Sequence, residues 1–291
     1  VEKPRALTDQ GLKNLVAFAK LYGYVRHFHP SDAVEKADWN AYAMAGIPAI
    51  EGATDSADLA KRLQAFFAPI APSVRVYVTG SKPNTPIVTA PPKGATPVQL
   101  VTWENIGFGG GTIPPEQNVY HSKRIFVAKP AGAFPPGMDP AVPFEADLGG
   151  GVSCQVPTVL YAQGNSALPH TAAPAIPAGV REVPTGDDRT TRLASTVIAW
   201  NVYEHFYPYF DEVKVNWAPV LTDTLTAAAT DPNERAFLTT LRKLVASAHD
   251  GHGYVGHPSD TDMAQPAMLA DWVEGKFVVT AVPQGFDRTL P

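Results

Sequence analysis

The chain of 291 residues contains one cysteine, Cys154. A single cysteine cannot form a disulfide within the chain, and it excludes a zinc module built from several cysteines. No run of 18 or more apolar residues occurs, so no membrane-spanning helix is predicted. Lysine and arginine number 23 against 28 aspartate and glutamate residues, and this net charge of −5 provides no basic stripe for nucleic acid.

Proline, by contrast, is abundant and unevenly placed. Of the 29 prolines, 16 lie between residues 81 and 180. Proline and glycine interrupt helices and mark turns, so this region is expected to differ from its flanks. Alternating apolar residues predict short strands at Val74–Val78, Val98–Trp103 and Arg124–Val127. Short strands separated by such turns are typical of a β-sandwich.

The two flanks are predicted to be helical, and they are copies of each other. A shift of 178 residues aligns His27–Pro30 with His205–Pro208, and a tryptophan follows each motif after eight residues, Trp39 and Trp217. Leucines align at the same shift. A period this long excludes a solenoid. Features present in both copies are therefore expected to be structural, and features of one copy to be specialised.

The predicted fold class is α+β, with two duplicated helical bundles flanking an inserted antiparallel β-sandwich-like module. The first bundle is expected over residues 1–74 and the Pro/Gly-rich β module over 75–185. The second bundle is expected over 186–258, and a linker that leads into a further strand over 259–291. We expect the chain to be the front part of a longer protein.

Three histidines lie close together after the last predicted helix: His249, His252 and His257. They suggest a zinc site, although no metalloprotease signature is present. The first copy has Val74 where the second has His252, so the Asp250-Gly251-His252 element is specific to the second copy. An imidazole ordinarily titrates near neutral pH, and a histidine on an exposed turn is suited to general-base catalysis. Asp250 is expected to orient the turn or the ring.

Other candidates have structural interpretations beside the functional ones. His27 and His29 form an H-x-H pair, a pattern that suggests metal binding. The second copy has Tyr207 in place of the second histidine, which favours a structural role. His27 and His205 are also placed to cap helix C-termini as imidazolium ions. Ser153 follows a glycine run that suggests oxyanion donors, although a buried strand over Gly149–Tyr161 is favoured. The Gly107–Gly111 segment lacks the features of a phosphate loop, and Cys154 is predicted to be a buried small hydrophobe.

The segment from Leu241 to Val255, with its His249-Asp250-Gly251-His252-Gly253-Tyr254 core, resembles the entry to the protease core of S41 peptidases, the C-terminal-processing and tricorn-like serine proteases. The helices around His205–Pro208 and Trp217 resemble the bundle that precedes that core. The segments Glu104–Gly111, Tyr120–Arg124 and Asp147–Ser153 resemble the β region inserted in larger bacterial members.

The resemblance implies that a PDZ-like domain and an α/β core follow the helical bundle, and that the core carries a nucleophilic serine. The PDZ-like segment is expected to start within residues 259–291, with Gly275–Val282 as its first strand. In the tricorn-like branch a histidine before the PDZ-like domain is the base, and His252 would be that residue, supported by Asp250 and Gly251. In the processing branch a Ser/Lys pair does this work. The implied partner is a polypeptide substrate, with no cofactor or metal, and the implied location is periplasmic or extracellular.

Two other functions are open from the sequence. The first is a stand-alone carbohydrate- or protein-binding β module, which an exposed row of Trp103, Phe108 and Tyr120 would favour. The second is a metal-dependent hydrolase that uses His249, His252 and His257. Without a serine core, the 291 residues themselves are predicted to be inactive on peptides.

Overall fold

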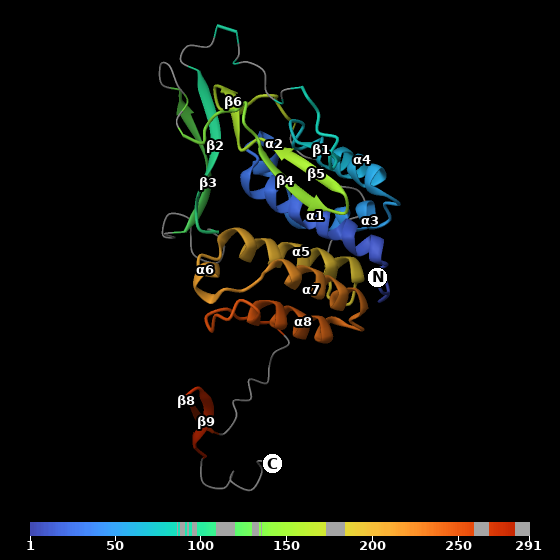
Figure 1. Ribbon diagram of the computed structural model, residues 1–291, viewed down its shortest axis with the longest axis vertical. Coiled ribbons are helices and arrows are strands. Elements are labelled where there is room, and N and C mark those ends of the chain that lie inside the picture. Colours follow the sequence, from blue (N-terminus) through green and yellow to red (C-terminus); the bar gives the residue numbers. More distant parts are fainter. Residues whose placement is uncertain are drawn as a thin grey trace. The chain divides into compact units, whose positions relative to one another are not determined.

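Figure 1 shows the computed structural model of the chain. It describes residues 1–85, 87, 91, 93–94, 98–108, 120–129, 134, 136–172, 184–258 and 268–282. Two compact units are present, Val1–Val255 and Gly256–Pro291. The second unit contains one hairpin, in which β8 (Leu269–Val273) pairs with β9 (Lys276–Ala281). The strand predicted after Gly275 therefore has a partner that precedes it in the chain.

The first helical copy consists of α1 (Asp9–Phe28), α2 (Asp32–Lys36), α3 (Trp39–Glu51) and α4 (Ser56–Phe67). Each begins after a side chain that accepts a hydrogen bond from a backbone N–H of the first turn; these residues are Thr8, Ser31, Asp38 and Asp55. Such N-caps satisfy donors that have no partner within the helix. The local sequence thus fixes where every helix of this copy starts.

The second copy repeats this order with α5 (Arg189–Phe206), α6 (Phe210–Val213), α7 (Ala218–Thr230) and α8 (Glu234–Ala246). Helices α1 and α5 end at the phenylalanine of the repeated motif, and α4 and α8 begin at positions related by the same shift of 178 residues. Aspartate and asparagine side chains cap α5 and α8. The duplication predicted from the sequence is confirmed. None of the described helices is long and apolar enough to cross a membrane.

The described residues between the two copies form seven strands. They are β1 (Arg75–Val78), β2 (Gln99–Ile106), β3 (His121–Ala128), β4 (Phe144–Gly149), β5 (Val152–Val156), β6 (Val159–Gln163) and β7 (Ser166–Ala167). One antiparallel sheet has the order β1-β5-β4 and the other β3-β2-β6-β7. The α+β class is therefore confirmed. The predicted boundaries near residues 74 and 185 mark changes of secondary structure inside one compact unit.

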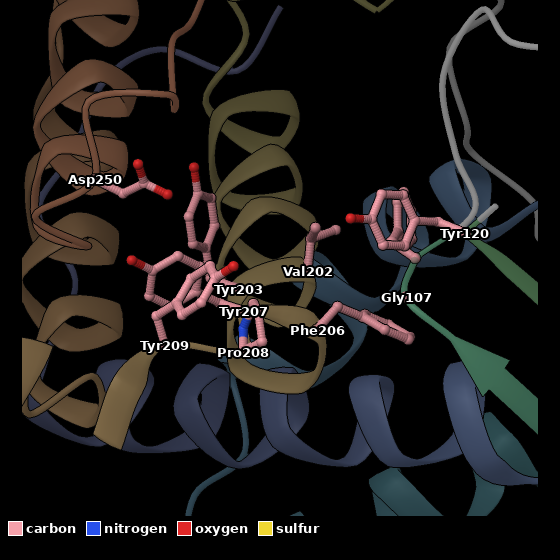
Figure 2. A pocket seen from close by; sticks show the side chains of 10 residues that line it. Gly107, Tyr120, Val202, Tyr203, Phe206, Tyr207, Pro208, Tyr209 and Asp250 are labelled. Carbon is pink, nitrogen blue, oxygen red and sulfur yellow. The ribbon is translucent and has the colours of Figure 1, made fainter. Parts of the chain in front are cut away.

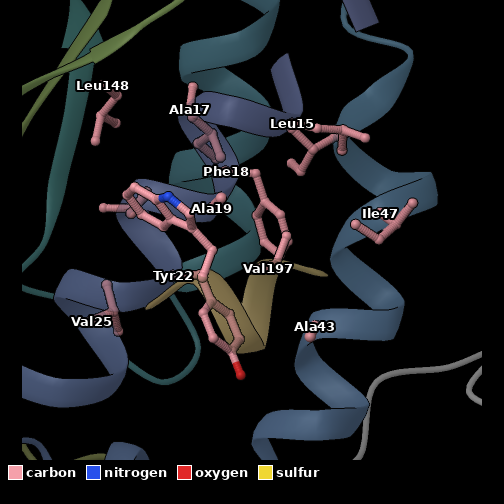
Figure 3. Packing of buried hydrophobic residues seen from close by; sticks show 14 of the residues in the cluster. Leu15, Ala17, Phe18, Ala19, Tyr22, Val25, Ala43, Ile47, Leu148 and Val197 are labelled. Carbon is pink, nitrogen blue, oxygen red and sulfur yellow. The ribbon is translucent and has the colours of Figure 1, made fainter. Parts of the chain in front are cut away.

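The three-stranded sheet joins the helical core. Leu148, Val152 and Cys154 are fully buried and belong to the same cluster as the apolar faces of both helical copies. Figure 3 shows Leu15, Phe18 and Tyr22 of α1 at the centre of this cluster, with Ile47 and Val197 beside them. Burying a large apolar side chain stabilises a fold by about 1.5–3 kcal/mol, so this shared core holds the copies together.

The four-stranded sheet buries smaller clusters of its own. Val101, Leu160 and Ala162 form one of them, and Leu100, Val159 and Tyr161 form another. Alternate residues of β2 and β6 thus contribute to different clusters, as the two-residue period of a strand requires. The lower ends of β2 and β3 in Figure 1 bring Gly107, Phe108 and Tyr120 beside the C-terminal end of α5.

Equivalent residues of the two copies meet between α1 and α5. The rings of His27 and His205, which occupy corresponding positions, lie with centroids 5.6 Å apart. Gly23 corresponds to Asn201, and a Cβ added at Gly23 would lie 1.8 Å from the Asn201 side-chain oxygen. The amide of Asn201 donates to the Ala19 carbonyl across the interface. Glycine is therefore required on α1 for the helices to pack this closely.

Candidate functional site

The predicted Asp250–His252 pair is formed in the structure. The Oδ1 atom of Asp250 accepts a hydrogen bond from the His252 backbone N–H at 2.9 Å and lies 2.7 Å from the His252 ring Nδ1. The His252 side chain is 96% exposed, whereas that of Asp250 is 25% exposed. One carboxylate oxygen thus orients both the turn and the ring.

The electrostatics fix the proton position on this ring. The two hydrogen bonds from His252 lower the pKa of Asp250 below its ordinary value, so the carboxylate is ionised at neutral pH. A carboxylate accepts and does not donate, and Nδ1 must therefore carry the ring proton. Nε2 makes no hydrogen bond with the described residues and presents a lone pair to solvent. This arrangement is suited to accepting a proton from a hydroxyl group.

The turn that carries the pair is built at the end of α8. Ser247 donates to the Lys243 carbonyl, and His249 adopts the left-handed conformation with φ of 53°. A Cβ at Gly251 would meet no atom within 4 Å, so space does not require glycine there. A Cβ at Gly253 would lie 2.7 Å from Val245 and 2.9 Å from the Tyr203 hydroxyl. Gly253, rather than the predicted Gly251, allows the turn to lie against α5.

Beside the turn lies a cavity of about 440 Å³. Figure 2 shows the tyrosine and phenylalanine side chains that come from the end of α5 and the segment after it, with Tyr120 from just before β3 and the Asp250 carboxylate directed toward the α5 tyrosines. The lining residues are Gly107, Phe108, Tyr120, Val202, Tyr203, Phe206, Tyr207, Pro208, Tyr209 and Asp250. We call this cavity the tyrosine pocket. Its volume lies within the range of small-ligand sites.

The rings of the tyrosine pocket are held by packing. Tyr203 lies 5.2 Å from the buried Trp217 ring, and Tyr207 lies 5.8 Å from Tyr203 and 5.7 Å from Tyr209, measured between centroids. The Tyr207 hydroxyl donates to the Ala248 carbonyl. Burial and the nearby Asp250 carboxylate raise the pKa of Tyr203 and Tyr207. Both hydroxyls therefore stay protonated at neutral pH.

The three histidines suggested as zinc ligands are divided between the two units of the chain. His249 and His252 are exposed on the turn, and His257 belongs to the second unit. Among the described residues, no group of three or more histidine, cysteine, aspartate or glutamate side chains is arranged to hold a metal. The metal-dependent alternative therefore receives no support from the geometry.

The histidines of the helix ends are neutral: His27 and His29 are buried, and His205 is half-buried. His29 Nε2 lies 2.7 Å from the Ser73 hydroxyl, while His27 faces His205 and Phe206. Burial lowers the pKa of His27 to about 2, of His29 to about 3 and of His205 to about 4. The prediction that His27 and His205 cap helices as imidazolium ions is therefore wrong, because desolvation outweighs the helix dipole.

The remaining nucleophile candidates are structural. Gly149, Gly150 and Gly151 all have positive φ and make the turn from β4 to β5, where the Ser153 hydroxyl lies 2.9 Å from that of Thr79. Cys154 is fully buried, and burial raises the pKa of its thiol to about 12. The prediction that Cys154 is a buried small hydrophobe is confirmed. Gly109–Gly111 of the predicted glycine loop lie outside the described residues.

The aromatic row expected of a stand-alone binding module is not present as one exposed face. Trp103 is half-buried, packs against the helical core and donates from its indole to the His29 carbonyl at 3.1 Å. Phe108 and Tyr120 instead line the tyrosine pocket. Trp103 on β2 therefore packs in the core, whereas Phe108 and Tyr120, which flank β2 and β3, line the pocket.

The tyrosines of the pocket were not among the residues that the sequence singled out. Tyr203, Tyr207 and Tyr209 correspond to Val25, His29 and Ser31 of the first copy, all of which are buried. An alignment of the copies at the shift of 178 residues carries this signal, because three tyrosines are gained close together in one copy.

Comparison with protein-family models, curated proteins and solved structures finds no match to this chain. The geometry of the site therefore carries the functional argument.

Proposed function

We propose that this chain is the non-catalytic front region of an S41-like serine endopeptidase and supplies the general base, His252. The observation that carries the proposal is the Asp250–His252 pair, in which Nδ1 is bound at 2.7 Å and Nε2 is open to solvent. The proposal is also supported by the presence of this pair in the second helical copy alone. The first copy has Pro72 and Val74 at these positions, and Val74 is buried.

In the proposed reaction, His252 Nε2 accepts the proton of a serine hydroxyl while the serine oxygen attacks the carbonyl carbon of the peptide bond. Asp250 stabilises the imidazolium that forms, because its carboxylate accepts the hydrogen bond from Nδ1. His252 then gives the proton to the departing amine nitrogen. This is the division of labour of serine, histidine and aspartate in other hydrolases.

The exposure of His252 supports a role toward a second surface. A base works best where water is excluded, and a side chain that is 96% exposed is available to be covered by another domain. We propose that a serine-bearing core supplies that cover, and that its substrate is a polypeptide. Neither Cys154 nor Ser153 replaces such a serine, since the first is buried and the second is bonded to Thr79.

The test is peptide hydrolysis by the protein encoded by the complete reading frame that contains these residues. His252→Ala is expected to lower kcat/KM by at least about 100-fold, the scale of a lost general base. Asp250→Asn is expected to lower it as well and to shift the pH profile, because the neutral amide no longer favours the charged ring. His249→Ala provides the matched control, since His249 is an exposed histidine on the same turn.

Three results would overturn the proposal. They are a reading frame without a serine-bearing core, unchanged hydrolysis after His252→Ala, and hydrolysis by the 291-residue chain alone that survives this substitution.

A further inference from the structure

The tyrosine pocket combines two features that recognise organic cations. Its walls are mainly aromatic, and the faces of tyrosine and phenylalanine rings carry negative electrostatic potential. Asp250 is the one charged side chain among the described residues that line it. In a neighbouring cavity a cation already lies against one of these rings: the Arg26 guanidinium lies 5.8 Å from the centre of the Phe108 ring.

Asp250 can serve the pocket and His252 together. Both of its hydrogen bonds with His252 are made through Oδ1. Oδ2 makes no hydrogen bond with the described residues, and Figure 2 shows the carboxylate facing the tyrosines. Asp250 is ionised at neutral pH, and the bonds to His252 lower its pKa further, so a full negative charge faces the pocket.

The residues of the pocket differ together between the two copies. Tyr203, Tyr207 and Tyr209 replace Val25, His29 and Ser31 of the first copy, and Asp250 replaces Pro72. The first copy uses its three positions for buried packing. Pro208 and Phe206, which match Pro30 and Phe28, are common to both copies and frame the pocket. The three tyrosines and Asp250 therefore occur in the same copy as His252.

We infer that the tyrosine pocket binds an alkylammonium group, presented by a lysine side chain of the polypeptide substrate. The ammonium would lie against Asp250 Oδ2 and the ring faces of Tyr207 and Tyr209, with its alkyl stem over Phe206. An anion is disfavoured by Asp250, and a neutral apolar side chain would leave that carboxylate without a partner. The polypeptide part of this inference rests on the proposed function; the cation preference does not.

The test is titration of the 291-residue chain with three probes, followed by NMR or by the fluorescence of Trp217, which contacts Tyr203. The probes are a blocked tetrapeptide with one lysine, the same peptide with norleucine, and n-butylammonium. The lysine peptide is expected to bind at least about threefold to tenfold more tightly than the norleucine peptide, the range of one cation–ring contact. Equal affinity of these two peptides would overturn the cation site.

Two variants locate the binding. Asp250→Asn is expected to remove the preference for lysine over norleucine, and Tyr209→Leu to weaken lysine binding by about threefold or more. Tyr254→Leu is the matched control: Tyr254 is 88% exposed but does not line the pocket. Loss of lysine binding in this control but not in Tyr209→Leu would assign the cation elsewhere. An unchanged urea midpoint for each variant excludes misfolding as the cause.

The remaining measurements distinguish a lysine side chain from a free amine, and the cation site from the proposed function. Binding of n-butylammonium as tight as that of the lysine peptide would assign the pocket to a free amine and overturn the polypeptide part. His252→Ala is expected to leave lysine binding unchanged, because Asp250 and the rings stay in place. If this variant abolishes binding, the cation is not held by the pocket. If hydrolysis by the complete protein is unaffected by His252→Ala, the proposed function fails while the titration result stands.

Discussion

The two helical copies share their framework and differ where the fourth helix ends. In the first copy the Tyr22 hydroxyl donates to the Trp39 carbonyl at 2.9 Å, and in the second the indole of Trp200, the corresponding residue, donates to the Trp217 carbonyl at 3.1 Å. After α4 the chain runs through buried Val74 into β1, which pairs with β5. After α8 it makes an exposed turn that carries His252.

The two copies also differ in how they use the residue that follows the first helix. In the first copy His29 is fully buried against Ser73, whereas Tyr207 at the equivalent position faces a cavity while bonding Ala248. Both residues tether the segment that follows the fourth helix of their own copy. In the first copy the segment after the fourth helix thus packs against a sheet, whereas in the second copy it is exposed beside a cavity.

The largest expected effect concerns the buried histidines. Folding lowers the pKa of His27, His29 and His205 to about 2, 3 and 4, so between those values and about 6.5 the unfolded chain binds more protons than the folded one. Stability is therefore complete above about pH 7 and is lost as pH falls. Within this window each histidine lowers the free energy of unfolding by about 1.4 kcal/mol per pH unit. Together the three histidines lower it by about 6 kcal/mol between pH 8 and pH 5.

Urea unfolding at several pH values measures this loss. His29→Gln, which keeps a polar group beside Ser73, is expected to reduce the pH slope by about one third. A flat profile between pH 7 and pH 5 would contradict the assignment of these three histidines to the buried framework.

Exchange of residues between the copies is expected to have the next largest effect. Val74→His places an imidazole in a site that is 1% exposed and is expected to cost about 3 kcal/mol from overpacking and desolvation. The reverse exchange, His252→Val, is expected to change the free energy of unfolding by less than about 0.5 kcal/mol. Chemical denaturation compares the two, and similar costs would show that the turns are not specialised differently.

The contact between the copies is tested by Gly23→Ala. The added Cβ would clash with Asn201 Oδ1 and with His205 Nε2, 1.8 Å and 2.5 Å away, and is expected to cost about 1–3 kcal/mol. Gly52→Ala is the control, because a Cβ there meets nothing within 4 Å. If Asn201→Ala does not recover part of the loss in a double-mutant cycle, the cost arises elsewhere.

The smallest expected effect concerns the hydrogen bond that joins the first helix of each copy to the start of the third. Tyr22→Phe removes the hydrogen bond that the hydroxyl donates to the Trp39 carbonyl and the one that it accepts from Arg26, and it is expected to cost about 1 kcal/mol, measured as a shift of the urea midpoint. A neutral result would show that the bond to Trp39, although repeated in the second copy, contributes nothing to the bundle.

Much of this organisation could be predicted from the sequence because it is local. N-cap residues and apolar periodicity identify the helices, as for α3 over Trp39–Glu51. The prediction of one strand over Gly149–Tyr161 missed a break after β5, where Pro157 cannot donate a ladder hydrogen bond. Strand β4 was missed because its exposed positions give it little hydrophobic alternation, and Leu148 alone is fully buried.

The site was predictable only in part, for the same reason. Asp250 and His252 are two residues apart, so the turn itself brings them together. The tyrosine pocket depends on the placement of α5 against α8 and against the ends of β2 and β3, and no local pattern encodes that arrangement. The low pKa values of the histidines likewise follow from burial by distant segments.

The most direct measurement is the kcat/KM of the complete protein on a peptide substrate for His252→Ala beside His249→Ala. A specialised second copy predicts a loss of at least about 100-fold for His252→Ala and less than about twofold for His249→Ala. Equal activity of the two variants and the unaltered protein would contradict it.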